Sequence, residues 1–174
     1  HAETTLPMAQ VLSGELEPKK LPVSATLDIK PYELSQISKV RGALTAHAEL
    51  HGTAGMPEVT AKVHSNSLQI EDFSVGPLDL DASLDHQQLL KANLDARQKE
   101  GLLQVTAKTF VPPRADATHL QLLSKNFKLD YQPHPGTASL NDAIGMVRGV
   151  LNADLQVQTT KDWLPSVKGY VKLE

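Results

Sequence analysis

The sequence predicts an all-β fold: an elongated antiparallel sheet with one or two short helices. Three observations predict it. Apolar and polar residues alternate along most of the chain, short turn signals separate the alternating runs, and part of the sequence is repeated. An alternation with a period of two gives each strand one apolar face and one polar face. Such strands are typical of antiparallel sheets that keep one face in water.

The alternating runs predict the strands in order. They lie at residues 23–30, 44–51, 59–63, 78–85, 90–96, 103–107 and 150–157. Residues 43–51 alone also fit an alanine-rich helix. Their repeated copy at 150–157 alternates and contains branched residues, which disfavour helices, so we predict a strand at both places.

Turns and breaks separate these runs. Turn signals lie at 52–57, 75–77, 86–88 and 99–101. Residues 111–114 include two prolines, which lack the N–H of a central strand, and are predicted to join two units. Residues 31–38 and 139–147 break the alternation, and each is predicted to form a turn or two of helix. Pro31 suits a first helical turn and Ser139 suits an N-cap.

An internal repeat organises the chain. The motif Leu-Asp-x-x-Pro begins at Leu27 and again at Leu129, and Val-Arg-Gly begins at Val40 and again at Val147. A loop and a Pro-x-Val follow each Val-Arg-Gly, and the unit is roughly 105 residues long. We therefore expect a first unit at 1–113 and the start of a second at 114–174, continuous with the first. Stacked sheet units of this kind form elongated assemblies.

Composition excludes several classes of function. Lys and Arg number 17 against 20 Asp and Glu, for a net charge of −3, which argues against a nucleic-acid surface and a polybasic membrane patch. No apolar run approaches the roughly 20 residues of a membrane helix. Cysteine is absent, which rules out disulfides, thiol catalysis and thiolate metal sites. The chain begins His-Ala-Glu, so we expect a piece of a longer protein or a mature form.

The apolar residues are almost all aliphatic. Hydrophobic residues make up 40% of the chain and aromatic residues only 4%. Pockets and protein-binding hot spots usually draw on aromatic side chains. Aliphatic surface without them fits either an ordinary core or a groove for aliphatic chains.

The order of these motifs resembles the repeats of TamB/AsmA-like proteins, which are long periplasmic proteins of Gram-negative bacteria. The resemblance implies a folded-over antiparallel sheet, the β-taco, whose apolar inner face forms a long groove. It also implies a periplasmic location, an inner-membrane anchor in the full-length protein, and neighbouring repeats of the same chain as partners. Family members are associated with phospholipid transport and with assembly of outer-membrane β-barrel proteins.

A groove for acyl chains requires a continuous aliphatic stripe without charges, and the apolar positions of the alternating runs meet this requirement. The predicted lipid-facing residues are Val23, Ala25, Leu27, Ile29, Leu44, Ala46, Ala48, Leu50, Val59, Ala61, Val63, Leu78, Leu80, Ala82, Leu84, Leu90, Ala92, Leu94, Leu103, Val105, Leu151, Ala153, Leu155 and Val157. We predict passive conduction of phospholipid or fatty acyl chains between the inner and outer membranes.

Two alternatives stay open. The same stripe fits the closed core of an ordinary β-sandwich, such as a module of a surface adhesin. A structural or chaperone module would instead pair its sheet edges with strands of outer-membrane β-barrel proteins during their assembly. An enzyme is not expected, because the sequence has no Gly-x-Ser-x-Gly, phosphate-binding glycine loop or His-Glu-x-x-His. No catalytic residue, cofactor or nucleic-acid partner is predicted.

Two polar groups suggest metal sites at first sight. His47, Glu49 and His51 share one face of a strand, but the two histidines lie about 13 Å apart there, too far for one zinc ion. The acidic row Asp79, Asp81 and Asp85 lacks the glycine turn and the final glutamate of a calcium loop. We predict that both groups are parts of a solvated polar face and that neither holds a metal.

The recurring Arg-Gly pairs and the single tryptophan have two interpretations each. Arg41-Gly42 and Arg148-Gly149 suit a glycine bend with the arginine over a helix C-terminus, or contact with a lipid headgroup. Trp163, in the loop 161–165, suits a loop anchor, or contact with a membrane or partner.

Overall fold

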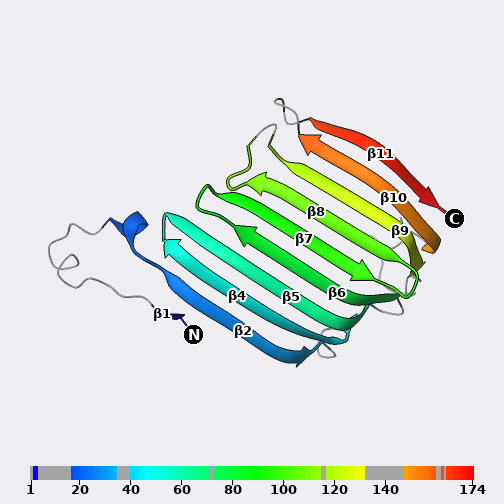
Figure 1. Ribbon diagram of the computed structural model, residues 1–174, viewed down its shortest axis with the longest axis horizontal. Coiled ribbons are helices and arrows are strands. Elements are labelled where there is room, and N and C mark those ends of the chain that lie inside the picture. Colours follow the sequence, from blue (N-terminus) through cyan, green and yellow to red (C-terminus); the bar gives the residue numbers. More distant parts are fainter. Residues whose placement is uncertain are drawn as a thin grey trace, which may run out of the picture.

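One antiparallel sheet forms the computed structural model, and its strands follow one another across the sheet (Figure 1). The structure describes residues 2–3, 17–34, 40–70, 73–114, 117–131, 147–159, 162 and 164–174. The strands are β1 (Ala2–Glu3), β2 (Ser24–Glu33), β3 (Val40–Arg41), β4 (Ala43–Thr53), β5 (Met56–Ile70), β6 (Phe73–Leu84), β7 (Leu89–Arg97), β8 (Leu102–Phe110), β9 (His119–Tyr131), β10 (Val147–Thr159) and β11 (Pro165–Leu173).

The strand order is β1-β2-β4-β5-β6-β7-β8-β9-β10-β11, and the short β3 pairs with β5. Every pairing is antiparallel, as the one-sided alternation predicts. Within the described residues there is one sheet and no second sheet packed on it. The all-β, antiparallel prediction is therefore confirmed, and the closed sandwich is wrong for this part of the chain.

Most of the predicted boundaries are confirmed. β4 turns into β5 at Ala54–Gly55, β6 ends before 85–88, and β7 ends before 98–101. β8 ends at Phe110, just before the two prolines of the predicted joint. The sheet continues across that joint, because β8 pairs with β9 from Leu102 to Lys108.

Two predicted local structures are wrong. Pro31 does not start a helix: β2 continues to Glu33, with a register shift between Ile29 and Tyr32 that accommodates the proline. Leu34 then has 3-10 geometry, and residues 35–38 of this predicted helix lie outside the described residues. Val75–Pro77 is not a turn but lies inside β6, where Gly76 has a φ of 87°. The predicted helix at 139–147 lies outside the described residues except for Val147, which begins β10. The structure also has a 3-10 turn at Pro18–Lys20.

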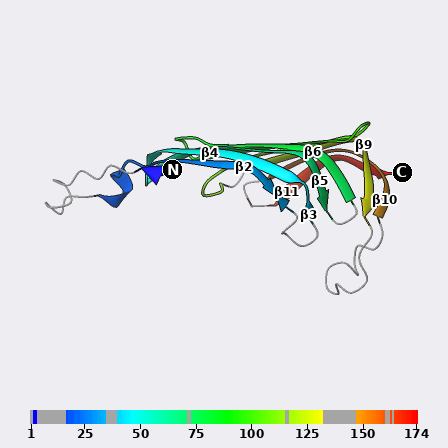
Figure 2. The same cartoon turned by 90° about the horizontal axis from the view of Figure 1, so that it is seen from below.

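The sheet bends near one end of its strands. Register shifts lie between Ile29 and Tyr32 in β2, between Ser65 and Leu68 in β5, and between Ser124 and Phe127 in β9. A bulge bends its strand and increases the local twist. These irregularities lie toward the same end of the three strands, and the strand ends turn out of the plane of the sheet there (Figure 2).

A small core fills the inside of this bend. Val75, Ala96 and Phe127 are buried together, and the rings of Phe73 and Phe127 meet edge to face with centroids 6.2 Å apart. This contact joins β6 to β9, although β7 and β8 lie between them in the sheet. Ala96 lies on the aliphatic side of β7, opposite Leu78 and Leu103. The sheet therefore curls toward its aliphatic face, which confirms the curled sheet that we predicted.

Polar side chains complete the hydrogen bonding at the bend. Ser65 donates to the carbonyl of Ala43 at 2.8 Å, and Ser124 donates to the carbonyl of Leu151 at 2.9 Å. Both serines are buried, and a buried hydroxyl without a partner would be costly. The Gln98 amide group bridges β6 and β9: it donates to the carbonyls of Ser74 and Lys128 and accepts the N–H of Lys128. These bonds help to hold the bend closed.

Candidate functional site

The predicted lipid-facing residues of the strands lie on one face of the sheet, because the register places apolar residues opposite apolar residues. We call this surface the aliphatic face. Its central row contains Ile29, Ala46, Val63, Leu80, Leu94, Val105, Leu122 and Leu155, each paired with the next across β2 to β10. Val23 precedes β2 and is half-buried. At about 4.8 Å between strands, the nine strands from β2 to β11 give the face a width of about 38 Å.

Next to the central row lies a row of small side chains, which we call the alanine row. Its members are direct partners on five consecutive strands: Ala48, Ala61, Ala82, Ala92 and Ala107. Larger aliphatic residues flank it on both sides, with Leu80 and Leu94 in the central row and Leu84 and Leu90 in the row beyond. The side chains of the alanine row are therefore shorter than those of the rows on either side of it.

The aliphatic face is not sealed. Ala153 is buried, whereas the other predicted lipid-facing residues are half-buried or exposed, including Ala46, Leu80 and Leu94. Leu78, Leu103 and Leu151 pack against the core of the bend. Exposure is greatest at the two ends of the sheet, where Leu27 of β2 is 55% exposed and Val171 of β11 is 58% exposed.

Several residues of this face are not among the predicted lipid-facing residues. Leu120 and Leu122 of β9 and Val167 and Val171 of β11 continue its rows. The alternation in β9 is interrupted by Leu123, which pairs with Gln104 and Asp154 on the opposite face. The run starts Leu-Gln-Leu-Leu, so Leu123 obscures the alternation. The spacing of two residues from Leu120 to Leu122 and on to Ser124 is the signal that indicates a strand here.

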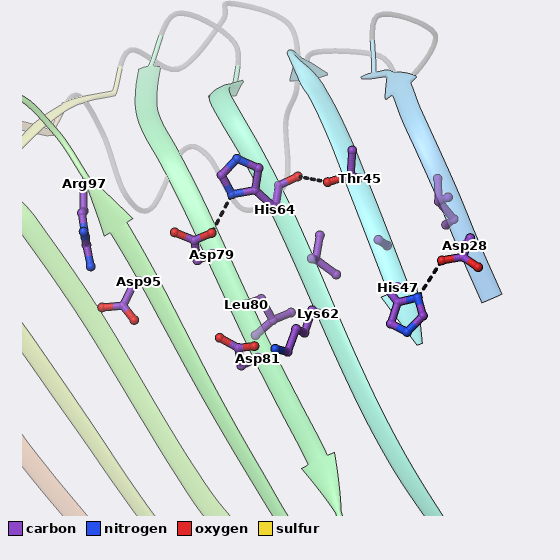
Figure 3. A pocket seen from close by; sticks show the side chains of 13 residues that line it. Asp28, Thr45, His47, Lys62, His64, Asp79, Leu80, Asp81, Asp95 and Arg97 are labelled. Atoms are coloured by element: carbon purple, nitrogen blue, oxygen red, sulfur yellow. Dashed lines mark hydrogen bonds and ion pairs between the residues drawn. The ribbon is translucent and has the colours of Figure 1, made fainter. Parts of the chain in front are cut away.

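The opposite face is polar and carries a hollow of about 660 Å³ over β2 to β7 (Figure 3). We call it the charged hollow. Its ionisable lining residues are Asp28, His47, Lys62, His64, Asp79, Asp81, Asp95 and Arg97. His47, Asp79 and Asp81 are among them, which confirms that these three residues belong to a solvated polar face.

His47 lies between two carboxylates. Its Nδ1 is 2.6 Å from Oδ1 of Asp28 on β2, and its Nε2 is 3.2 Å from Oε1 of Glu49 on its own strand. Hydrogen bonds to Asp28 first, and then to Glu49, raise the pKa of His47. Nε2 of His51 lies 3.8 Å from the other Glu49 oxygen. No group of three or more possible metal-binding side chains occurs among the residues that the structure describes.

His64 has a similar arrangement one strand further on. Its Nδ1 is 2.6 Å from Oδ1 of Asp79 on β6, and its Nε2 is 2.9 Å from Oδ1 of Asn66. The hydrogen bond to Asp79 first, and then that to Asn66, raises the pKa of His64. Each histidine thus ties its strand to a neighbouring strand through a carboxylate.

The acidic row divides into two parts. Asp79 is directly opposite Asp95, and like charges in this position repel. His64 contacts the first carboxylate and Gln104 donates to the second, which offsets the repulsion. Asp85 lies in the next turn and accepts the N–H groups of Leu89 and Gln87; the bond from Leu89 contributes most to lowering the pKa of Asp85. Asp85 therefore shapes a turn.

The repeated arginines lie near the bend. Nε of Arg148 is 2.7 Å from Oδ1 of Asp130 on β9, which gives it a partner on the neighbouring strand. Arg41 belongs to β3 and is paired in register with Gln69. The helix that Arg148 was predicted to cover, and Trp163, lie outside the described residues.

Comparison with known proteins finds no relative of this chain. No protein family, curated protein or solved structure matches the chain. No helix in the described part of the chain is both long and apolar enough to cross a membrane.

Proposed function

We propose that the aliphatic face binds lipid acyl chains and that the chain is a segment of a periplasmic lipid-transfer protein. In this proposal the full-length protein is anchored in the inner membrane, and acyl chains move passively along the face toward the outer membrane. The observation that carries the proposal is the unbroken aliphatic surface across β2 to β11, left uncovered by any described strand. Exposed apolar surface of this extent marks a binding site more often than an ordinary surface.

The chemistry of the face suits a ligand without polar groups. Each methylene removed from water contributes about 0.8 kcal/mol, and the contact has no preferred direction. The hydroxyls on these rows are already engaged: Ser65 and Ser124 donate to backbone carbonyls, and Thr109 shares a hydrogen bond with Thr118. An acyl chain therefore meets no unpaired hydroxyl of these residues that would hold it in one position.

The alanine row gives the acyl chain a path. Its five strands span about 19 Å, against the roughly 15 Å that one leaflet of acyl chains fills in a bilayer. We expect one chain to lie along this row, with the leucines of the flanking rows on either side.

Enlarging the alanine row is expected to weaken lipid binding without unfolding the sheet. Ala92→Phe places a ring in the middle of the alanine row, at a half-exposed position where the extra volume extends into solvent. We expect a loss of affinity for a fluorescent fatty acid and an unchanged circular dichroism spectrum. Asn93→Phe is the matched control, because Asn93 is the next residue on the polar face of β7. Equal affinities in both variants and in the wild type would contradict this path.

The direct experiment is to purify the protein, extract it with organic solvent and analyse the extract by mass spectrometry. We expect phospholipid or fatty acid in the extract, or uptake of either when the protein is incubated with lipid vesicles. If the protein neither carries nor takes up any lipid, the proposal is wrong.

A second candidate function follows from the edge of β11. Every residue from Pro165 to Leu173 is exposed, and no described strand pairs with the outer edge of β11. An open edge can add a strand of another protein, as an assembly module for outer-membrane β-barrels would require. This function predicts binding of extended peptides that is insensitive to charges on the aliphatic face, which separates it from lipid transfer.

A further inference from the structure

The two histidines of the charged hollow occupy equivalent positions across strand junctions. His47 connects β4 to Asp28 of β2, and His64 connects β5 to Asp79 of β6 (Figure 3). In register, His47 is opposite Asp28 and His64 is opposite Asp79, so each contact is a direct cross-strand pair. Cross-strand pairs of opposite charge stabilise a sheet, whereas neutral imidazole provides a weaker attraction.

The geometry favours the doubly protonated form of both rings. A neutral imidazole has a single N–H, and its other nitrogen is an acceptor. Both nitrogens of His47 face carboxylate oxygens, so both contacts are hydrogen bonds only when the ring carries two protons. His64 faces a carboxylate oxygen and an amide oxygen in the same way.

We propose that protonation of His47 and His64 strengthens two strand pairings, that of β2 with β4 and that of β5 with β6, as the pH falls. This inference does not depend on the proposed lipid function. It assigns to the charged hollow two pH-sensitive contacts between strands, His47–Asp28 and His64–Asp79.

Other charged groups around His47 also affect its protonation. Lys62 on β5 is directly opposite His47 and opposes its protonation, whereas Asp28 and Glu49 favour it. His51 lies beyond Glu49, and Lys30 lies two residues beyond Asp28 on β2.

Around His64, the carboxylates favour protonation. Asp79 is its direct partner on β6, and Asp81 follows two residues later. Asp95 on β7 is opposite Asp79, on the side away from His64. Thr45 is opposite on β4 and is uncharged, and Lys62 is two residues away on the same strand.

The raised pKa values fix the sign of the effect. A group whose pKa is higher in the folded protein stabilises it fully below its ordinary pKa, which for histidine is about 6.5. This stabilisation is lost as the pH rises through the raised pKa. β2 is the strand that the change affects most, because it lies next to the end of the sheet and its pairing with β4 runs from Ala25 to Glu33.

Amide hydrogen exchange across the whole chain tests the proposal. We expect the protection factors of β2, and those of the β5–β6 pairing, to fall severalfold between about pH 6 and about pH 8, beyond any change in β9. His47→Gln should remove this pH dependence from β2 alone, and His64→Gln should remove it from the β5–β6 pairing alone. His119→Gln is the matched control, because His119 lies on the polar face of β9, away from the hollow.

Three results would overturn the proposal. One is a wild-type protein whose protection in β2 and β5–β6 does not depend on pH. Another is a pH dependence that survives in both variants. The third applies even if the variants fail to fold: in an NMR titration of the wild-type protein, the ring midpoints of His47 and His64 lie at or below the ordinary histidine value.

Discussion

Replacing Leu94 by aspartate is expected to reduce the affinity for fatty acids at least about tenfold while the sheet stays folded. Leu94 lies in the central row between Leu80 and Val105, next to the alanine row. A carboxylate at this position must lose part of its hydration when an acyl chain covers it, and that cost opposes the methylene contacts. Titration with a fluorescent fatty acid measures the affinity, and circular dichroism verifies the strands.

The control places the same charge on the other face. Thr106→Asp changes β8 at the residue that pairs with Asn93, the neighbour of Leu94 in the chain. Its side chain belongs to the polar face, so lipid binding should not change. Wild-type affinity in Leu94→Asp, or an equal loss in both variants, would remove the aliphatic face from the binding site.

Replacing Gly76 by alanine is expected to destabilise the protein by about 3 kcal/mol. Gly76 has a φ of 87°, which side chains other than glycine rarely adopt. A Cβ at this position would also overlap the carbonyl oxygen of Arg97 on the neighbouring strand. This carbonyl belongs to the end of β7 at the bend, so relief requires movement of the backbone. Chemical denaturation measures the loss.

Ser83→Ala is the control for this substitution, because Ser83 lies on the polar face of the same strand, where β6 pairs regularly with both β5 and β7. We expect little change in its stability. If Gly76→Ala were as stable as Ser83→Ala, the bend would not depend on this glycine.

The regular parts of the sheet were predictable from the sequence because alternation is a local signal. Runs such as Leu78–Leu84 contain enough alternating positions to identify strand and face together. Register follows with little ambiguity, since a slip of one residue would move Leu80 and its neighbours to the wet face. The apolar rows of the site were predictable for the same reason.

The irregular parts depend on contacts that no local pattern shows. Proline and glycine at Val75–Pro77 indicate a turn by themselves, but here Gly76 makes a bulge that brings β6 toward β9. The histidine–aspartate contacts between strands were not predictable either, because the partner of His47 is fixed by the register between β2 and β4. Histidine and aspartate at a distance of nineteen residues carry no signal until that register is known.

The strand order has a consequence for how the molecule comes apart. Most strands of the described residues contact mainly the two strands beside them; the short β3, which pairs with β5, and the junction of β6 with β9 depart from this order. In such a linear array, folding free energy is close to a sum of terms for adjacent neighbours. Melting should therefore begin at the outermost hairpins and advance inward, and the segment enclosed by the Phe73–Phe127 junction should be the last to lose its structure.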